Sequence, residues 1–175
     1  MGKSTRLNLG CGNDLLPDWT NVDKVHPLNI PEGISFVQDD VLSLSFCRNC
    51  TVAKIQANFL LEHVNTDEVG YALYQWNRVL ELGGEIHFKV PDFERIANDC
   101  VANVFNQMDK TACYNLFKKA NYHLLNPGDD AHRSLWTEEF AKIMLPTEGF
   151  EITCITHEGF REWYLCVAAR KVSGS

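Results

Sequence analysis

The stretch Arg6-Leu7-Asn8-Leu9-Gly10-Cys11-Gly12-Asn13, followed by Asn21-Val22-Asp23, decides the fold that the sequence predicts. Leu7 and Leu9 indicate a buried strand, and the glycines after it indicate a sharp turn that lets a ligand approach the main chain closely. Asp23, at the tip of a second short strand, can accept hydrogen bonds from the two hydroxyls of a ribose. An ordinary strand and turn with a surface aspartate contains the same residues, so the rest of the chain has to distinguish a ligand site from such a turn.

The composition is that of one globular domain spanning residues 1–175, with 45% hydrophobic and 22% charged residues. A formal net charge of −7 argues against binding to nucleic acid, whose affinity comes largely from Lys and Arg. The sequence has no apolar signal core and no run of about 20 apolar residues, so we expect no membrane association. Seven cysteines without framework spacing favour a cytoplasmic location.

One Cys-x-x-Cys pair, Cys47 and Cys50, raises the question of a metal site. A structural zinc site needs four ligands, and the sequence has no second pair at a suitable spacing. We therefore predict no metal site.

Strand and helix patterns alternate along the rest of the chain. Only ten residues separate Gly12 from Asp23, which leaves no room for a full crossover helix. A helix is expected from Asn65 or Thr66 to Gly83-Gly84, with an apolar face of Val69, Leu73, Trp76, Val79 and Leu80. The other expected elements are strands at 34–37, 51–58, 85–90, 150–156 and 163–170, a weak helical pattern at 93–121, and a helix at 137–145. This order predicts a mostly parallel sheet covered on both faces.

Polar or glycine residues stand at five consecutive strand ends. They are Gly10 with Gly12, Asp23, Asp40, Asn58 and Asp92. In open α/β sheets a ligand binds outside the carboxyl ends of the strands, where the strand order reverses. The series therefore predicts one crevice at this edge of the sheet.

These motifs, in this order, resemble those of the class I S-adenosylmethionine-dependent methyltransferases, and among them the small type 11 kind. The matching segments are 7–13, 21–23, 40–42, Leu60-Leu61-Glu62-His63-Val64, 76–84, 135–137, 148–150 and 165–170. The resemblance implies a Rossmann-like three-layer fold, with a mostly parallel seven-stranded sheet whose last strand is antiparallel. It also implies S-adenosylmethionine as the cofactor.

The resemblance assigns the cofactor site residue by residue. Gly10 and Gly12 would face the methionine part of the cofactor. Asn8, Cys11 and Asn13 would contribute to the same cofactor-binding turn. Asp23 would bind the ribose, with Lys24 beside it, and Asp40 and Val41 would hold the adenine. Asn58 and Phe59 would flank the methionyl end and the sulfonium. The sequence departs from the family pattern at Asn8, where an acidic residue is frequent, and at Asp14, which replaces a third glycine.

Candidate catalytic residues follow from the need for a base when the acceptor is a hydroxyl or amine. His63 and His132 are the candidates we select, although each could instead shape its loop; His123, Asp129 and Asp130 are weaker ones. The segment 92–136 is the expected substrate cover, and its aromatic and histidine residues favour a small polar acceptor such as a sugar or metabolite. Oligomeric state stays open.

Two other functions compete with this interpretation. A nicotinamide-dependent oxidoreductase would need Gly or Ala at position 15 and a helix directly after it; Leu15 and Pro17 count against that. The second is a non-catalytic cofactor-binding scaffold or partner subunit of another methyltransferase.

Overall fold

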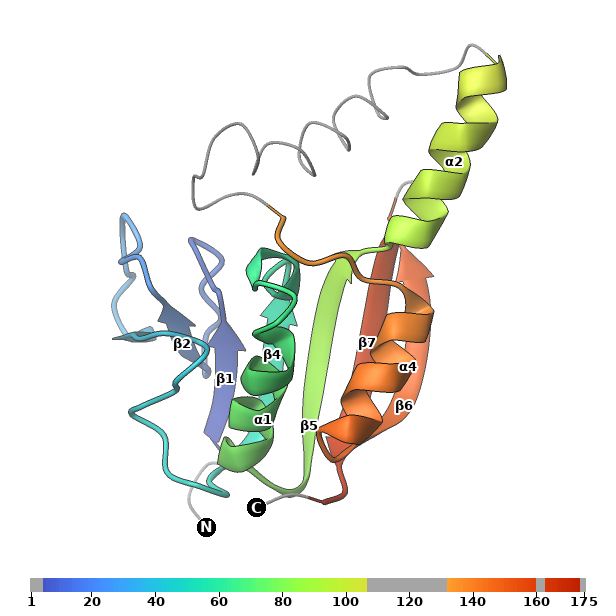
Figure 1. Cartoon of the computed structure of the whole chain (residues 1–175). Coiled ribbons are helices and arrows are strands. Elements are labelled where there is room, and N and C mark those ends of the chain that lie inside the picture. The colour runs from blue at the N-terminus through green and yellow to red at the C-terminus, as the bar shows by residue number, and fades with distance from the viewer. Residues whose placement is uncertain (1–4, 107–131, 160–162, 174–175) are drawn as a thin grey trace.

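A seven-stranded sheet forms the centre of the computed structural model, which describes residues 5–106, 132–159 and 163–173 (Figure 1). The strand order is β3-β2-β1-β4-β5-β7-β6. All neighbouring pairs from β3 to β5 are parallel, and β7 is antiparallel to both β5 and β6. The prediction of a mostly parallel sheet with an antiparallel last strand is confirmed. The strands are β1 Thr5–Leu9, β2 Thr20–Asp23, β3 Ser35–Gln38, β4 Val52–Asn58, β5 Leu80–Pro91, β6 Phe150–Glu158 and β7 Tyr164–Lys171.

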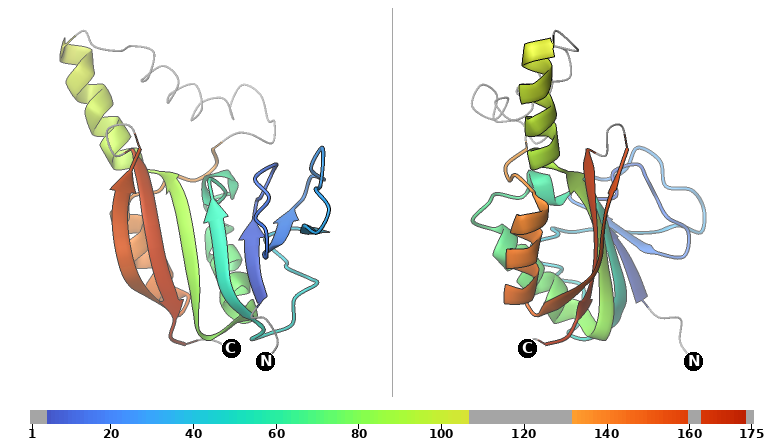
Figure 2. Two further views of the ribbon diagram at one scale, coloured as in Figure 1. Left: turned by 180° about the vertical axis from the view of Figure 1, so that it is seen from behind. Right: turned by 90° about the vertical axis from the view of Figure 1, so that its right-hand side faces the viewer.

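The helices in the described residues are η1 Leu61–His63, α1 Val69–Val79, α2 Phe93–Asn106 and α4 Glu138–Thr147. Figures 1 and 2 show α1 and α4 on the same face of the sheet, with α2 extending beyond its carboxyl edge. We expected helices on both faces. In the part of the chain that the structure describes, the opposite face carries none, because the connections β1–β2 and β2–β3 are too short to contain one.

The short connection between β1 and β2 is held by buried amides, and it contains no crossover helix, as predicted. Asn8 Nδ2 donates to Asn21 Oδ1 (2.9 Å) and to the Asp14 carbonyl (2.8 Å). Asn21 Oδ1 also accepts the N–H of Leu16 at 2.8 Å. Because these side chains satisfy the backbone of an irregular segment, the loop keeps one conformation beside the strand ends.

Helix α1 has the predicted apolar face but different ends. Val69, Leu73, Trp76, Val79 and Leu80 are all fully buried. The helix begins four residues later than expected from Asn65, and it ends at Val79 rather than at Gly83-Gly84. Leu80 already pairs with Val52 in the sheet. Gly83 has φ +82° and lies inside β5, where the register shifts between its partners Val52 and Lys54, so the glycines form an irregularity of the strand instead of a helix end.

The remaining elements lie close to their predicted positions. Thr137 caps α4 as expected, since its Oγ1 accepts the N–H of Phe140 at 3.1 Å. The outer strands differ from their expected bounds by one or two residues at either end. Of the helical pattern at 93–121, α2 accounts for residues 93–106, and positions 107–121 lie outside the described residues, as do His123, Asp129 and Asp130. No helix among the described residues is long and apolar enough to cross a membrane.

Candidate active site at the carboxyl edge of the sheet

A cavity of about 370 Å³ lies at the carboxyl ends of β1, β2 and β4, within the size range of ligand sites. Six of the residues predicted from the sequence line it: Gly10, Asp23, Lys24, Val41, Phe59 and His63. The other lining residues are Val25, Leu42, Leu60, Val64, Glu68 and Arg133. The predicted crevice therefore exists, and it contains residues that follow four successive strands.

The turn after β1 places main chain against the cavity. Gly10 and Gly12 both have positive φ, +63° and +48°. A Cβ on Gly10 would lie 2.7 Å from Leu60 Cδ1, so this position also requires glycine for packing. The Gly12 N–H donates to Asp23 Oδ2 (2.8 Å), and the Val25 N–H donates to Asp23 Oδ1 (2.9 Å). These bonds fix the carboxylate at the cavity and leave acceptor capacity on both oxygens.

The segment after β3 forms a second side of the cavity. Lys24 Nζ lies 3.2 Å from Asp40 Oδ2, which joins the ends of β2 and β3. Asp40 Oδ1 accepts the N–H of Leu42, and the Val41 carbonyl accepts a hydrogen bond from the buried Trp76 Nε1 at 3.0 Å. Trp76 of α1 thereby fixes the backbone of Val41, a residue that lines the cavity.

Phe59 has an unusual backbone conformation at the end of β4. Its φ is +54°, in the left-handed region that a residue other than glycine seldom adopts. Its N–H donates to the Lys89 carbonyl at 2.7 Å, and its ring meets Tyr164 edge to face, with centroids 5.1 Å apart. The strained conformation turns this half-exposed ring toward the cavity.

Several predicted site residues do not line this cavity. Asn8 holds the β1–β2 loop, and Asn58 lines a separate hollow on the uncovered face of the sheet, with Gln56 and Lys89. Asp92 directly precedes α2, where its carboxylate accepts the Arg95 N–H and lies 3.0 Å from His157 Nε2. Cys11, Gly12, Asn13 and Asp40 belong to the bordering loops without lining the cavity.

The thiol of Cys11 is buried, and burial together with the charge of Asp23 raises its pKa to about 11. It is therefore a packing residue at neutral pH.

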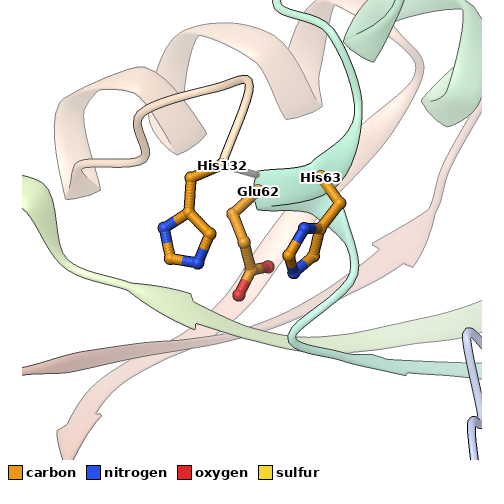
Figure 3. A group of neighbouring side chains, drawn as sticks. All are labelled: Glu62, His63 and His132. Carbon is orange, nitrogen blue, oxygen red and sulfur yellow. The ribbon is translucent and has the colours of Figure 1, made fainter. Parts of the chain in front are cut away.

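Glu62, His63 and His132 come together where η1 meets the segment before α4 (Figure 3). Glu62 is 2% exposed, and the rings of His63 and His132 lie edge to face with centroids 5.1 Å apart. The two candidate catalytic histidines are thus neighbours, but only His63 lines the cavity; His132 borders an adjoining hollow with Glu62. Glu68 and Arg133 also line the cavity, but they belong to no sequence motif and reach it only through the tertiary fold.

Comparisons with known proteins add the fold family. No protein-family model matches the chain, and no curated protein matches it significantly. Among solved structures, 1,6-didemethyltoxoflavin-N1-methyltransferase from Burkholderia thailandensis, with bound 1,6-didemethyltoxoflavin and S-adenosylhomocysteine, is 17% identical, with a TM-score of 0.65 over 97% of this chain and 71% of that one. An S-adenosylmethionine-dependent methyltransferase from Mesorhizobium loti is 14% identical, with a TM-score of 0.67 over 97% and 91%.

A third similar structure is the complex between a methyltransferase activator and a putative methyltransferase from Haloferax volcanii. It has a TM-score of 0.68 at 10% identity and covers 97% of this chain and 83% of that one. These similarities, together with the strand order, show that the chain has the Rossmann-like fold of the S-adenosylmethionine-dependent methyltransferases.

Proposed function

We propose that this protein is an S-adenosylmethionine-dependent methyltransferase that transfers a methyl group to a small polar acceptor, a hydroxyl or amine of a sugar or metabolite. The observation that carries the proposal is the cavity at the carboxyl edge of the sheet, which Gly10, Asp23, Val41 and Phe59 line together. Each of these residues follows a different strand, and each was assigned to the cofactor from the sequence.

The cavity offers each part of the cofactor a suitable partner. The Asp23 carboxylate, oriented by two backbone N–H groups, is placed to accept hydrogen bonds from the ribose hydroxyls. Val41 and Leu42 provide backbone and apolar surface for the adenine, and the hydrogen bond from Trp76 Nε1 to the Val41 carbonyl holds this loop. Gly10 leaves space for the methionyl part, and Phe59 for the sulfonium end. Asn8 supports this site indirectly, by holding the loop.

The reaction asks little chemistry of the protein, because a sulfonium methyl group is already activated. Holding the acceptor in line with the carbon–sulfur bond can supply roughly 7–11 kcal/mol. His63, at the cavity, is the residue that we propose to take the acceptor's proton, with His132 beside it.

The segment 92–136 is proposed as the substrate cover of a single domain. Its two ends meet in a bridge between Asp92 and Trp136, and Trp136 lines the hollow that Glu62 and His132 border; residues 107–131 of the segment lie outside the described residues. The net charge of −7 favours a small molecule over nucleic acid as the acceptor. Cys11, Cys47, Cys50, Cys154 and Cys166 are free, which suits the cytoplasm.

Calorimetry with S-adenosylmethionine tests the cofactor assignment. We expect a dissociation constant in the micromolar range, weakened more than tenfold in Asp23→Ala because the ribose loses its acceptor. Asp14→Ala is the matched control, since Asp14 lies exposed in the β1–β2 connection and does not line the cavity. Equal affinity in both variants would remove the ribose assignment.

Turnover is tested separately, with labelled S-adenosylmethionine, cell extract as the source of acceptors, and adenosylhomocysteine as the measured product. We expect product with the wild-type chain and at least about 100-fold less with His63→Ala. A chain that binds the cofactor but transfers nothing would fit the second candidate, a non-catalytic partner subunit. The similarity to a putative methyltransferase in complex with an activator keeps that candidate in view.

A further inference from the structure

Glu62, His63 and His132 have the donor atoms and the spacing of a metal site. Each offers one ligand atom, and these atoms lie within 4.8 Å of one another. In a tetrahedral site with bonds of about 2.0–2.2 Å, the ligand atoms stand roughly 3.3–3.6 Å apart, so small side-chain rotations bring all three onto one ion. No other group of three His, Cys, Asp or Glu residues with this spacing occurs in residues 5–106, 132–159 and 163–173.

The two segments that supply these side chains are fastened together by buried hydrogen bonds. The Glu62 carbonyl accepts the N–H groups of Arg133 (2.6 Å) and Ser134 (3.1 Å). Ser134 Oγ donates to the Leu61 carbonyl at 2.8 Å and accepts from Trp136 Nε1 at 3.1 Å. The backbone of His132 is therefore held beside η1 by contacts that do not use the three side chains. A rigid frame of this kind is what a preorganised ligand set requires.

The placement of charge favours a cation at this point. Glu62 is almost fully buried, and Figure 3 shows its side chain beside the two imidazole rings. A buried carboxylate is stabilised when a positive charge accompanies it. Two imidazoles and one carboxylate are a ligand set that zinc and non-haem iron sites use, whereas Mg²⁺ and Ca²⁺ prefer oxygen ligands throughout.

We propose that Glu62, His63 and His132 bind one divalent first-row transition-metal ion beside the cofactor cavity. Three protein ligands leave at least one coordination position open, and His63 brings that position to the cavity wall.

The substrate class follows from this position and rests on the proposed function. In the metal-bound site His63 is a ligand instead of the base, because a hydroxyl group bound to the ion loses its proton to solvent more easily, as water does on zinc. Its oxygen then forms a bond with the methyl carbon, and the electrons of the broken carbon–sulfur bond return to sulfur, leaving a thioether. The metal site therefore assigns a hydroxyl compound, rather than an amine, as the acceptor.

Cobalt and zinc titrations of the metal-free, reduced protein test the site without any cofactor. We expect one Co²⁺ per chain, with an absorption spectrum of nitrogen and oxygen ligands, displaced by Zn²⁺ and unaffected by excess Mg²⁺. Glu62→Gln, His63→Ala and His132→Ala should each weaken binding at least about 100-fold. His26→Ala and His87→Ala, which remove histidines outside the cluster, should bind as the wild type does. Circular dichroism of each variant confirms folding.

Three results would overturn the metal site. These are no binding by the folded wild-type chain, equal binding by the three cluster variants, or a cobalt–thiolate charge-transfer band, which would place the ion on cysteines. The first would leave a metal-free cluster of one carboxylate and two imidazoles. Calorimetry with S-adenosylhomocysteine on the same samples separates the two proposals: cofactor binding without metal binding rejects this inference alone, and metal binding without cofactor binding rejects the proposed function.

Discussion

At the scale of single residues, Gly10 shows how packing and ligand access depend on the same missing Cβ. Its φ of +63° costs another residue about 1–2 kcal/mol, and a Cβ there also contacts Leu60 at 2.7 Å. Gly10→Ala should lower the free energy of unfolding by the conformational cost plus about 1–3 kcal/mol of overpacking, and should weaken cofactor binding. Urea unfolding and calorimetry measure the two effects.

Gly12→Ala is the control, because Gly12 has a similar φ of +48° but open space where its Cβ would lie. Gly12→Ala should lower the free energy of unfolding only by the conformational cost of its positive φ. Equal losses in the two glycine variants would mean that Leu60 moves aside freely and that the close approach at Gly10 has no energetic weight.

Substitution of Trp76 tests whether a residue that does not line the cavity affects cofactor binding there. Trp76→Phe keeps most of the buried ring but leaves the Val41 carbonyl without its indole donor, at a cost of about 1–3 kcal/mol. We expect weaker cofactor binding in this variant, because the carbonyl belongs to the proposed adenine loop. Trp136→Phe also removes a buried indole hydrogen bond, to Ser134, and should cost similar stability while changing cofactor affinity less. Equal affinity losses would contradict a specific role for Trp76.

At the scale of elements, the loop after β3 is organised by one carboxylate. Asp39 accepts hydrogen bonds from the N–H of Asp40, the hydroxyl of Ser43, and both the N–H and hydroxyl of Ser45. Burial acts to raise the pKa of Asp39, but these hydrogen bonds outweigh it and lower the pKa below the ordinary 3.8. The charged form is therefore the one that the folded loop prefers.

Because folding lowers the pKa of Asp39, we expect the free energy of unfolding to depend on pH. A lowered folded-state pKa contributes stability that is fully present above about 3.8 and is lost as the pH falls through the folded pKa. Asp39→Asn should therefore be less stable than the wild type at pH 7, and the difference should shrink below pH 3.8. Urea unfolding across this pH range measures it, with the exposed Asp67→Asn as control. A constant difference at all pH values would mean that ionisation of Asp39 plays no part.

The apolar face of α1 could be predicted from the sequence, but the residue at which the helix ends could not. Its apolar face could be predicted from periodicity, and the cap of α4 from Thr137, because both signals are local. The end of α1 could not, because it depends on the far end of the chain: the ammonium group of Lys171, in β7, donates to the carbonyls of Asn77 and Leu80.

At the scale of the whole molecule, Lys171 joins the last strand to the first long helix. It is 3% exposed, and the helix carbonyls it contacts carry partial negative charge. Lys171→Met should lower the free energy of unfolding by about 1–3 kcal/mol, because two buried carbonyls lose a charged donor. Arg170→Met, which breaks the exposed pair with Glu151, should cost no more than about 1 kcal/mol. Similar losses in the two variants would contradict the structural role of Lys171.

Sequence patterns also predicted the cavity at this scale, since glycines and carboxylates that follow parallel strands meet at one edge. They could not predict that Asn58 faces the opposite side of the sheet, because the direction of the last strand residue depends on the pairing of β4. Nor could they predict that His132 joins the adjacent Glu62 and His63, because it lies far from them in sequence and is held beside them by the hydrogen bonds of Arg133 and Ser134.

A crystal structure with S-adenosylhomocysteine is the most direct test of the central claim, that successive strand ends form one cofactor site. We expect the ribose hydroxyls to bind the Asp23 carboxylate, the adenine to pack against Val41, and the sulfur to lie near Phe59 and His63. A cofactor bound in the hollow of Gln56, Asn58 and Lys89, on the opposite face of the sheet, would contradict it.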